Sequence, residues 1–495
     1  MPRVVINPAD KIGVISPYLY GHFTEHLGRC FYDGVWVGEN SPVPNTAGFR
    51  NDILAALRKI KPSVIRWPGG CFADDYHWQD GVGPRQSRPR RTNIHWGEVV
   101  ETNEVGTQEF VRFCRLVGAE PYICGNVGSG TVRELRDWVE YCNFTGDSSW
   151  AQQRLKDGSP EPLGVTFWGI GNESWGCGGN FSPEDYCTEF RRYASFVRGF
   201  GKRLFVIACG PSGNDLEWTQ RFFDKLFKDY RAFNNIQGFA AHYYCGTAGT
   251  ATEYSEEQWY QLIAQGLEIE PLIVQQRLAM DAYDPQRQIG LVIDEWGTWH
   301  PVEKGTNPAF LFQQNTLRDA LVAATNLDIF NRQADKIVMA NIAQMVNVLQ
   351  SMVLTEGEKM LVTPTGLVYT MYAPHQGGEA VRWDIETEMI AFKSGEKEIG
   401  LPMLAGSASI KGKALFLTLT NQHAVHPVEV QVGLLGGARA TSSLAFILTG
   451  EIHAHNTFDQ PDAVSIQPMK MQAFGNSFTV AIPPASVVAA AVSLE

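Results

Sequence analysis

The sequence has little of what membrane, secreted and nucleic-acid-binding proteins need. No apolar run is long enough to cross a bilayer, and residues 1–13 lack the apolar segment of a secretory signal. Basic residues are in the minority, with 41 Lys and Arg against 53 Asp and Glu, which gives a net charge of −12. That charge disfavours binding to nucleic acid or to an anionic membrane, since both need a basic surface. We therefore expect a cytoplasmic protein with a neutral polar substrate.

Cysteine pairs of the CxxC type are also missing. The nine cysteines are an odd number and are scattered along the chain. Cys114, Cys124 and Cys209 fall within predicted helices or strands, so we interpret the cysteines as reduced, buried thiols. Cys177 lies in a glycine-rich segment without an obvious set of His and Asn partners, and we interpret it as a core or loop thiol.

Up to about residue 375, short apolar runs alternate with helical patterns. One unit has a helix over 107–117, with Thr107 as its cap and Gly118 at its end, followed by an apolar run. The predicted strands are 18–23, 63–67, 121–126, 164–170, 203–208, 237–243, 289–294 and 336–341. Eight strands separated by helices indicate a parallel (β/α)₈ barrel with insertions. An open doubly wound sheet is the rival fold, but no glycine-rich phosphate loop follows the first strand.

The pattern changes after about residue 380 to short runs, several of them alternating with period two. Examples are ALFLTLTNQ at 414–422, HPVEVQVGL at 426–434 and NSFTVAIPP at 476–484. Such runs, separated by turn residues, predict an antiparallel β-sandwich. The opening RVVINP has no helix after it and is predicted to add a strand to that sheet. We therefore divide the chain into a barrel at 13–378 and a sandwich made of 1–12 and 379–495.

Polar side chains gather where the predicted barrel strands end, which is where such barrels have their active sites. These side chains are His22, Glu25 and His26; Arg66; Asn126; Asn172 and Glu173; His242 and Tyr244; Asp294, Glu295 and Trp296; and Asn341 and Gln350. Acids, amides and aromatics with few lysines predict a pocket for a neutral polyol.

Two of these carboxylates have the placement that glycoside hydrolysis needs. One carboxyl group must protonate the leaving oxygen, while the other attacks the anomeric carbon or activates water. Glu173 and Glu295 end the fourth and seventh predicted strands, so they face one another across a closed barrel, and we predict that they are the catalytic pair. Asp294 is the alternative acid. Alternation along the strand turns one of these two neighbours away, and we favour Glu295 inward.

Two other features of the chain have competing interpretations. His22 and His26 have the spacing of metal ligands, but no third ligand is evident, and we expect neither a metal nor an organic cofactor. The basic run at 83–93 could bind phosphate, but on an acidic protein we expect it to pair with acidic surface or with another subunit.

Six ordered motifs resemble those of glycoside hydrolase family 51, the intracellular α-L-arabinofuranosidases. They are YGHFTEHLGRC, RWPGGCFADDYHWQDGVGP, WGIGNESWGCGGN, HYY, IDEWGTW and ANIAQMVNVLQSM. The likeness runs from about residue 3 into the C-terminal sandwich. It implies a (β/α)₈ barrel with a jelly-roll sandwich, which agrees with the periodicity. It also implies that Glu173 is the general acid/base and Glu295 the nucleophile of a retaining double displacement.

The resemblance implies further roles around this pair. Arg66 would keep Glu295 ionised, because a nearby cation lowers the pKa of a carboxylate. Asn172 would bind the 2-hydroxyl, and Tyr244 would orient the nucleophile. The residues expected to bind sugar are Glu25, Cys71, Asn172, His242, Tyr244 and Gln350. Cys71 is a departure, since many members have Asn after PGG, and it puts strict arabinose specificity in doubt.

The resemblance implies an exo-acting enzyme that releases terminal non-reducing α-L-arabinofuranosyl residues from arabino-oligosaccharides or arabinoxylan fragments. The alternative on the same scaffold is an endo-β-1,4-glucanase or xylanase, or a β-xylosidase. By analogy with family members, we expect a homo-oligomer, and specifically a hexamer.

Overall fold

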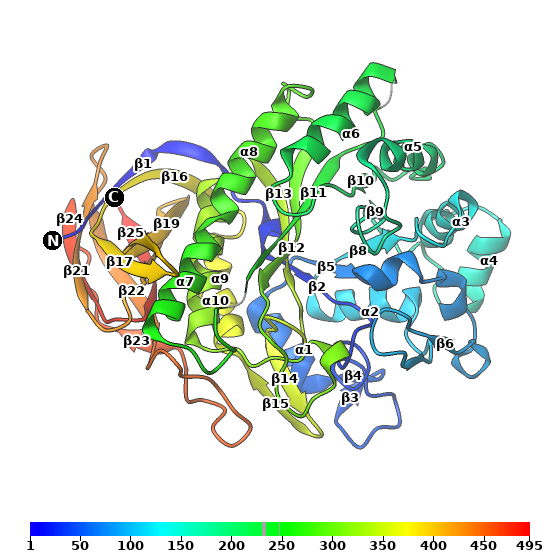
Figure 1. Ribbon diagram of the computed structural model, residues 1–495, viewed down its shortest axis with the longest axis horizontal. Helices are drawn as coiled ribbons and strands as arrows, with labels where there is room; N and C mark the ends of the chain where they lie inside the picture. The colour runs from blue at the N-terminus through cyan, green and yellow to red at the C-terminus, as the bar shows by residue number, and fades with distance from the viewer. Residues whose placement is uncertain (230–233, 247) are drawn as a thin grey trace.

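A computed structural model describes residues 1–229, 234–246 and 248–495 of the chain. A closed barrel and a large sheet domain lie next to one another, and both chain termini belong to the sheet domain at the left of Figure 1. Within the described residues, no helix is long and apolar enough to span a bilayer.

The barrel closes in the order β10–β11–β12–β13–β2–β5–β8–β9, with parallel neighbours throughout. Its strands are β2 (Gly21–Phe23), β5 (Val64–Trp67), β8 (Glu120–Gly125), β9 (Phe167–Ile170), β10 (Phe205–Ala208), β11 (Gly238–Cys245), β12 (Gly290–Thr298) and β13 (Ile337–Ala343). The predicted (β/α)₈ barrel is confirmed. The first strand begins later than predicted, because Ser16 caps a 3₁₀ helix, η1 (Pro17–Tyr20), that takes its first residues.

Helices connect the barrel strands. They are α1 (Asn51–Ile60), α2 (Thr107–Val117), α3 (Val132–Asn143), α4 (Ser149–Lys156), α5 (Pro183–Ala194), α6 (Leu216–Asp229), α7 (Glu256–Leu267), α8 (Ile269–Asp281), α9 (Leu317–Arg332) and α10 (Pro364–Tyr372). Helix α2 begins at Thr107, the residue predicted to cap it, and its N-cap is Gly106, whose N–H donates to the Glu109 carboxylate at 2.8 Å. The Thr107 hydroxyl instead accepts from the Trp138 indole at 2.9 Å, so the predicted cap was wrong by one residue.

The sheet domain contains a nine-stranded, mostly antiparallel sheet in the order β23–β22–β25–β20–β19–β16–β1–β21–β24. Its strands are β1 (Arg3–Val14), β16 (Glu379–Glu386), β19 (Leu404–Lys411), β20 (Ala414–Asn421), β21 (Val428–Leu434), β22 (Ala440–Thr449), β23 (Gln467–Met469), β24 (Ser477–Ile482) and β25 (Ser486–Leu494). Strand β1 pairs antiparallel with β16 and parallel with β21, so the N-terminal strand joins this sheet as predicted.

Both parts of the chain also contain small two-stranded sheets. They pair β3 (Asn45–Thr46) with β4 (Phe49–Arg50), β6 (Arg91–Thr92) with β7 (Val100–Glu101), β14 (Val353–Glu356) with β15 (Lys359–Val362), and β17 (Met389–Ser394) with β18 (Lys397–Pro402).

An apolar layer fills the amino-terminal half of the barrel interior and leaves the carboxyl ends of the strands for polar groups. It consists of Val64, Tyr122, Phe167, Ile207, Ala240, Val292 and Met339. These residues come from the strands as alternate inward-facing positions, which is how parallel barrels fill their centre. Further along the strands, Arg66 and Glu295 are buried as well, and a functional site therefore begins directly beyond this layer.

Candidate active site

A β-bulge in β12 brings two neighbouring acids to the same side of the strand. Ala241 pairs with Ile293 while His242 pairs with Glu295, so β12 holds one more residue than β11 over this stretch. Asp294 accepts hydrogen bonds from the Tyr122 hydroxyl at 2.8 Å and the Asn341 amide at 2.9 Å inside the barrel. Glu295 lines the pocket above it. The alternation argument was therefore wrong about Asp294, because a bulge interrupts the period of two.

Glu295 is held by hydrogen bonds that favour its ionised form. Arg66 donates to Glu295 at 2.8 Å, and the Tyr244 hydroxyl donates to its second oxygen at 2.8 Å. Burial alone would raise the pKa of Glu295, but His242 and Arg66 outweigh it and lower that pKa. A carboxylate that stays charged in a buried pocket has the state a nucleophile requires.

Glu173 follows the short strand β9 through a turn that needs unusual backbone angles. Gly171 has φ +81° and Glu173 itself φ +39°, a region that L residues other than Gly rarely adopt. His242 Nδ1 lies 3.0 Å from a Glu173 oxygen and 3.6 Å from a Glu295 oxygen. Burial by itself lowers the pKa of His242, but Glu295 and Glu173 outweigh it and raise that pKa. One oxygen of each glutamate and one nitrogen of His242 all lie within 4.8 Å of one another.

Glu25 also lines the pocket, and most of the hydrogen bonds that its carboxylate can accept are already made by protein groups. It accepts from the Phe72 backbone N–H at 3.0 Å, the Trp96 indole at 2.9 Å and the Gln344 amide at 3.1 Å. Burial is the main reason that the pKa of Glu25 is raised to about 7. A carboxylate has about four lone-pair sites, so three protein donors leave one for a ligand hydroxyl.

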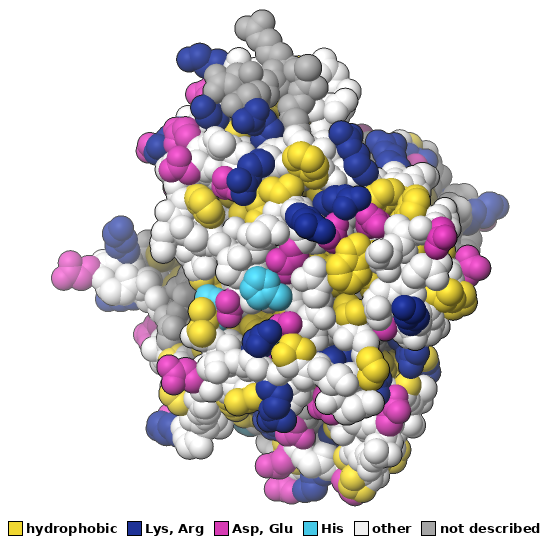
Figure 2. All heavy atoms as spheres, turned by 90° about the vertical axis from the view of Figure 1, so that its right-hand side faces the viewer, with side chains coloured by type: hydrophobic (Ala, Val, Ile, Leu, Met, Phe, Trp, Pro, Cys, Tyr) yellow, Lys and Arg dark blue, Asp and Glu magenta, His cyan; other side chains and the backbone are white. Residues whose placement is uncertain are grey.

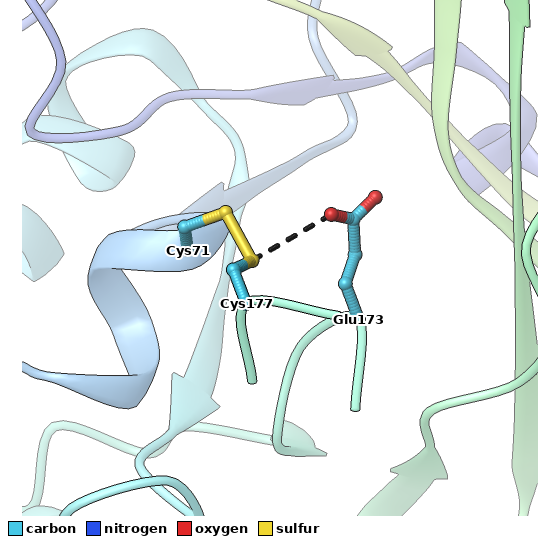
Figure 3. A group of neighbouring side chains, drawn as sticks. All are labelled: Cys71, Glu173 and Cys177. Atoms are coloured by element: carbon cyan, nitrogen blue, oxygen red, sulfur yellow. Dashed lines mark hydrogen bonds between the residues drawn. A yellow bond between two sulfur atoms is a disulfide. The ribbon is translucent and has the colours of Figure 1, made fainter. Parts of the chain in front are cut away.

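A disulfide joins Cys71 to Cys177 at the wall of the pocket, as Figure 3 shows. The Cα atoms lie 5.5 Å apart although the residues are 106 positions apart in sequence. The prediction that all cysteines are reduced was therefore wrong for this pair, while the other seven are free and buried as predicted. The two cysteines come from the loops after β5 and β9, which are far apart in sequence but meet at one end of the barrel.

The two predicted amide ligands differ in position. Asn172 lines the pocket, and its side-chain oxygen accepts from Arg66 at 2.5 Å. Gln350 is wholly buried behind the pocket, where its side-chain oxygen accepts from Thr298 N–H at 2.9 Å and its amide donates to the Asp319 carbonyl at 2.7 Å. Gln350 therefore supports the end of β12 and is not among the residues that line the pocket.

Sequence reasoning missed several residues that line the pocket. Those that were predicted are Glu25, Cys71, Asn172, Glu173, Tyr244 and Glu295. Those that were not predicted are Phe23, Leu27, Gly70, Trp96, Trp299, Leu311, Gln344 and Leu349. Trp96 follows the basic loop, and Gln344 comes one residue after β13. The position of Gln344 at a strand end was a usable signal, whereas nothing local distinguishes Trp96 from other loop tryptophans.

The two histidines and the basic run that were singled out in the sequence make different contacts. His22 packs against Tyr369, while His26 accepts from the Trp67 indole at 3.0 Å. Arg85, Arg88 and Arg91 of the basic run pair with acids of the same chain as predicted, for example Arg91 with Asp80 at 2.8 Å. Acidic and basic side chains are interspersed on the face shown in Figure 2.

Comparisons with known proteins agree with this arrangement. Residues 56–256 match the family model described as "Alpha-L-arabinofuranosidase 1 domain", and residues 294–486 match "Alpha-L-arabinofuranosidase C-terminal domain". An intracellular exo-α-L-arabinofuranosidase of Bacteroides ovatus is 42% identical over 484 residues, which cover 96% of this chain and 92% of the relative.

Solved structures agree with this match in sequence. The GH51 arabinofuranosidase from Xanthomonas axonopodis pv. citri has a TM-score of 0.95 and 41% identity, with complete coverage of both chains. The α-L-arabinofuranosidase from Thermotoga maritima, solved as an arabinose complex, has a TM-score of 0.85 and 31% identity, also with complete coverage. With barrel, sheet domain and strand-end acids all in place, this chain belongs to the α-L-arabinofuranosidases of glycoside hydrolase family 51.

Proposed function

We propose that this protein is a retaining α-L-arabinofuranosidase that releases terminal non-reducing residues from arabino-oligosaccharides or arabinoxylan fragments. The observation that carries the proposal is that oxygens of Glu173 and Glu295 lie within 4.8 Å of one another. Retaining enzymes have carboxyl groups about 5–5.5 Å apart, while inverting enzymes need about 6.5–9.5 Å to admit a water. The choice of sugar is supported by the family relatives, which are named for this activity.

The proposed reaction proceeds in two displacements. Glu295 attacks the anomeric carbon as the glycosidic bond breaks, and Glu173 gives its proton to the departing oxygen. This yields a glycosyl ester on Glu295 and a free alcohol. Glu173, now a carboxylate, then takes a proton from water as the water oxygen attacks the anomeric carbon and the bond from that carbon to Glu295 breaks, which frees Glu295 as a carboxylate. Arabinose leaves with its original configuration, and both glutamates return to their starting states.

The neighbouring side chains suit these roles. Arg66 and Tyr244 keep Glu295 charged and fix its two oxygens, so the nucleophile needs little reorganisation before attack. A proton on His242 would compensate the charge that Glu173 acquires when it protonates the leaving group, since the two groups lie 3.0 Å apart. Both effects act where charge changes during the reaction, which is where they accelerate it.

The pocket favours a single terminal sugar over a long chain. Its volume is about 60 Å³, and it is lined by Glu25, Trp96 and Gln344, which are joined by hydrogen bonds. A pocket of this volume has room for one terminal sugar and not for several consecutive ones. The small volume supports exo-action and argues against the endo-glucanase or xylanase alternative.

The test uses two alanine variants and two leaving groups. We expect Glu295→Ala to lose turnover on every substrate, because the variant lacks the carboxylate that attacks the anomeric carbon. We expect Glu173→Ala to lose about 10²–10⁴-fold in kcat/KM on arabinobiose but far less on 4-nitrophenyl arabinofuranoside, whose leaving group needs little protonation. Proton NMR of the first sugar released by the wild-type enzyme should show the α anomer. Equal losses on both substrates, or a β product, would contradict the assignment.

Product analysis separates the proposal from its alternative. The wild-type enzyme should release arabinose from arabinoxylan with little fall in viscosity and should leave carboxymethyl cellulose intact. An endo-enzyme would lower viscosity quickly, and a β-xylosidase would prefer an aryl xyloside to the arabinofuranoside.

We also infer a cytoplasmic homo-oligomer, specifically a hexamer. The location is supported by the Bacteroides ovatus relative, which is named intracellular. The oligomer is an inference from the family resemblance. Sedimentation velocity on the purified chain would give six times the 55.0 kDa of one chain, and a monomer would overturn this inference.

A further inference from the structure

The Cys71–Cys177 disulfide connects the turn that carries Glu173 to a second loop of the barrel. Cys71 begins a 3₁₀ helix, η2 (Cys71–Asp74), directly after the loop that leaves β5. Cys177 closes the turn that begins at Glu173, in which Gly176 N–H donates to the Glu173 carbonyl at 2.7 Å. The bond therefore ties the Glu173 turn to the start of η2, as Figure 3 shows.

The Glu173 turn is also anchored through its neighbouring residues. Ser174 N–H donates to Cys209 Sγ at 3.3 Å, and Phe181 N–H donates to the Ser174 carbonyl at 2.7 Å. Asp74, in the same helix as Cys71, accepts from Asn172 N–H at 2.7 Å and so fixes the residue before Glu173. The stretch from 174 to 179 contains three glycines, which add no side-chain packing. Since Glu173 itself has φ +39°, its backbone geometry depends on surrounding contacts rather than on local preference.

The disulfide also differs chemically from two thiols at this position. Cys177 Sγ lies 3.6 Å from Glu173 Oε2. A disulfide sulfur carries no hydrogen and can only accept, so this contact becomes a hydrogen bond only when Glu173 holds its proton. A thiol can donate to the charged carboxylate instead. The two redox states therefore make different contacts with the Glu173 carboxyl group.

We propose that the Cys71–Cys177 disulfide is a redox-sensitive positioning element for Glu173, and that its reduction selectively slows the step in which Glu173 acts as an acid. This inference rests on the proposed function. Disulfides in cytoplasmic proteins are usually transient or redox-sensing, and the proposed location places this bond in that class. Both cysteines are only half-buried, unlike the seven free ones, so a small dithiol can reach them.

The redox step is a thiol–disulfide exchange. A dithiol thiolate attacks one sulfur and displaces the other as a thiolate, and the second thiol of the reagent then closes its own disulfide. Two electrons pass to the protein, the sulfur–sulfur bond becomes two thiols after uptake of two protons, and the reagent leaves oxidised.

The experiment compares the wild-type enzyme before and after dithiothreitol, followed by reoxidation. Thiol alkylation and mass spectrometry of the native protein should show two new reactive cysteines, Cys71 and Cys177. We expect kcat/KM on arabinobiose to fall about tenfold, with less than about twofold change on 4-nitrophenyl arabinofuranoside, since a misplaced acid matters most for a poor leaving group. Reoxidation should restore the original kcat/KM on arabinobiose.

Two variants complete the test. The double variant Cys71→Ser/Cys177→Ser should have the kinetics of the reduced enzyme, and dithiothreitol should not change them. The control Cys142→Ala, which removes a buried thiol of α3, should respond to dithiothreitol as the wild type does. The inference is overturned if the purified protein has nine free thiols, if the bond resists dithiothreitol, or if reduction changes both substrates equally. Failure of the oxidised enzyme to cleave either arabinoside would instead contradict the proposed function.

Discussion

At the scale of single residues, the catalytic glutamates depend on hydrogen bonds from side chains that do not react. Tyr244 is the clearest case, because its hydroxyl donates to Glu295 while its ring packs edge-on against Trp299 at 5.1 Å. Removing the hydroxyl oxygen alone removes the hydrogen bond to Glu295 and keeps the packing of the ring.

Tyr244→Phe should lower kcat/KM on 4-nitrophenyl arabinofuranoside about 10- to 100-fold, since a hydrogen bond to a charged group contributes about 1.5–3 kcal/mol. The matched control is Tyr243→Phe, whose hydroxyl donates to the Gln265 carbonyl outside the pocket and whose loss should leave activity unchanged. Similar activity of the two variants would contradict the role of Tyr244.

Glu25 predicts a pH dependence of substrate binding. Burial raises the pKa of Glu25 to about 7, so this side chain is neutral below that pH and becomes a hydroxyl-accepting carboxylate above it. We expect KM to fall as pH rises from about 6 to 8, and we expect this slope to flatten in Glu25→Gln, which cannot ionise. KM measured across that range checks the prediction, and an unchanged slope in the variant would assign the titration to another group.

At the scale of secondary-structure elements, the ends of the barrel strands shape the pocket by backbone approach as well as by side chains. The loop after β5 passes so close to Glu25 that residue 70 has no room for a side chain. A Cβ there would lie 2.6 Å and 2.7 Å from the two oxygens of Glu25.

Gly70→Ala should therefore displace the Glu25 carboxylate and raise KM about tenfold, with a smaller change in kcat, because binding is lost more than chemistry. Gly433→Ala in β21 is the control, since a Cβ there meets only the Val4 carbonyl at 3.9 Å and should leave both constants unchanged. A fall in kcat with constant KM in Gly70→Ala would point to displacement of Glu173 or Glu295 instead.

At the scale of the whole molecule, α9 joins the barrel to the sheet domain through a buried carboxylate. Asp328 accepts from Ser407 in β19 at 2.7 Å, Thr418 in β20 at 2.5 Å and Tyr372 in α10 at 2.9 Å. Burial raises the pKa of Asp328 to about 6 despite these donors. The sheet domain is thus attached by a group whose charge changes below neutral pH.

Asp328 consequently makes stability depend on pH. The pKa of Asp328 is about 6 in the folded state and about 3.9 in the unfolded state. Its stabilising contribution to the free energy of unfolding is therefore fully present below about pH 3.9 and is lost as pH rises through about 6. We expect the free energy of unfolding of the wild type to fall, relative to Asp328→Asn, between pH 4 and 7. Thermal unfolding of both proteins at several pH values checks this, and parallel curves would contradict it.

The barrel and the positions of its acids were predictable from the sequence because they follow from local patterns. Apolar runs of strand length, separated by helical periods, indicate the eight strands. Glu173 lies in the turn after β9, and Glu295 lies in the second half of β12. Parallel closure then brings all strand ends to one face, whatever their distance along the chain. The pairing of β1 with the C-terminal sheet followed from the same logic.

Only the tertiary structure decided which groups touch at that face. The bulge that turns both Asp294 and Glu295 inward is a difference in register between β11 and β12, which no period within β12 records. The Cys71–Cys177 bond joins loops that are 106 positions apart, and Gln350 lies behind the pocket instead of in it. These outcomes depend on loop paths and strand offsets in space, whereas sequence periodicity reports only which face of its own element a residue occupies.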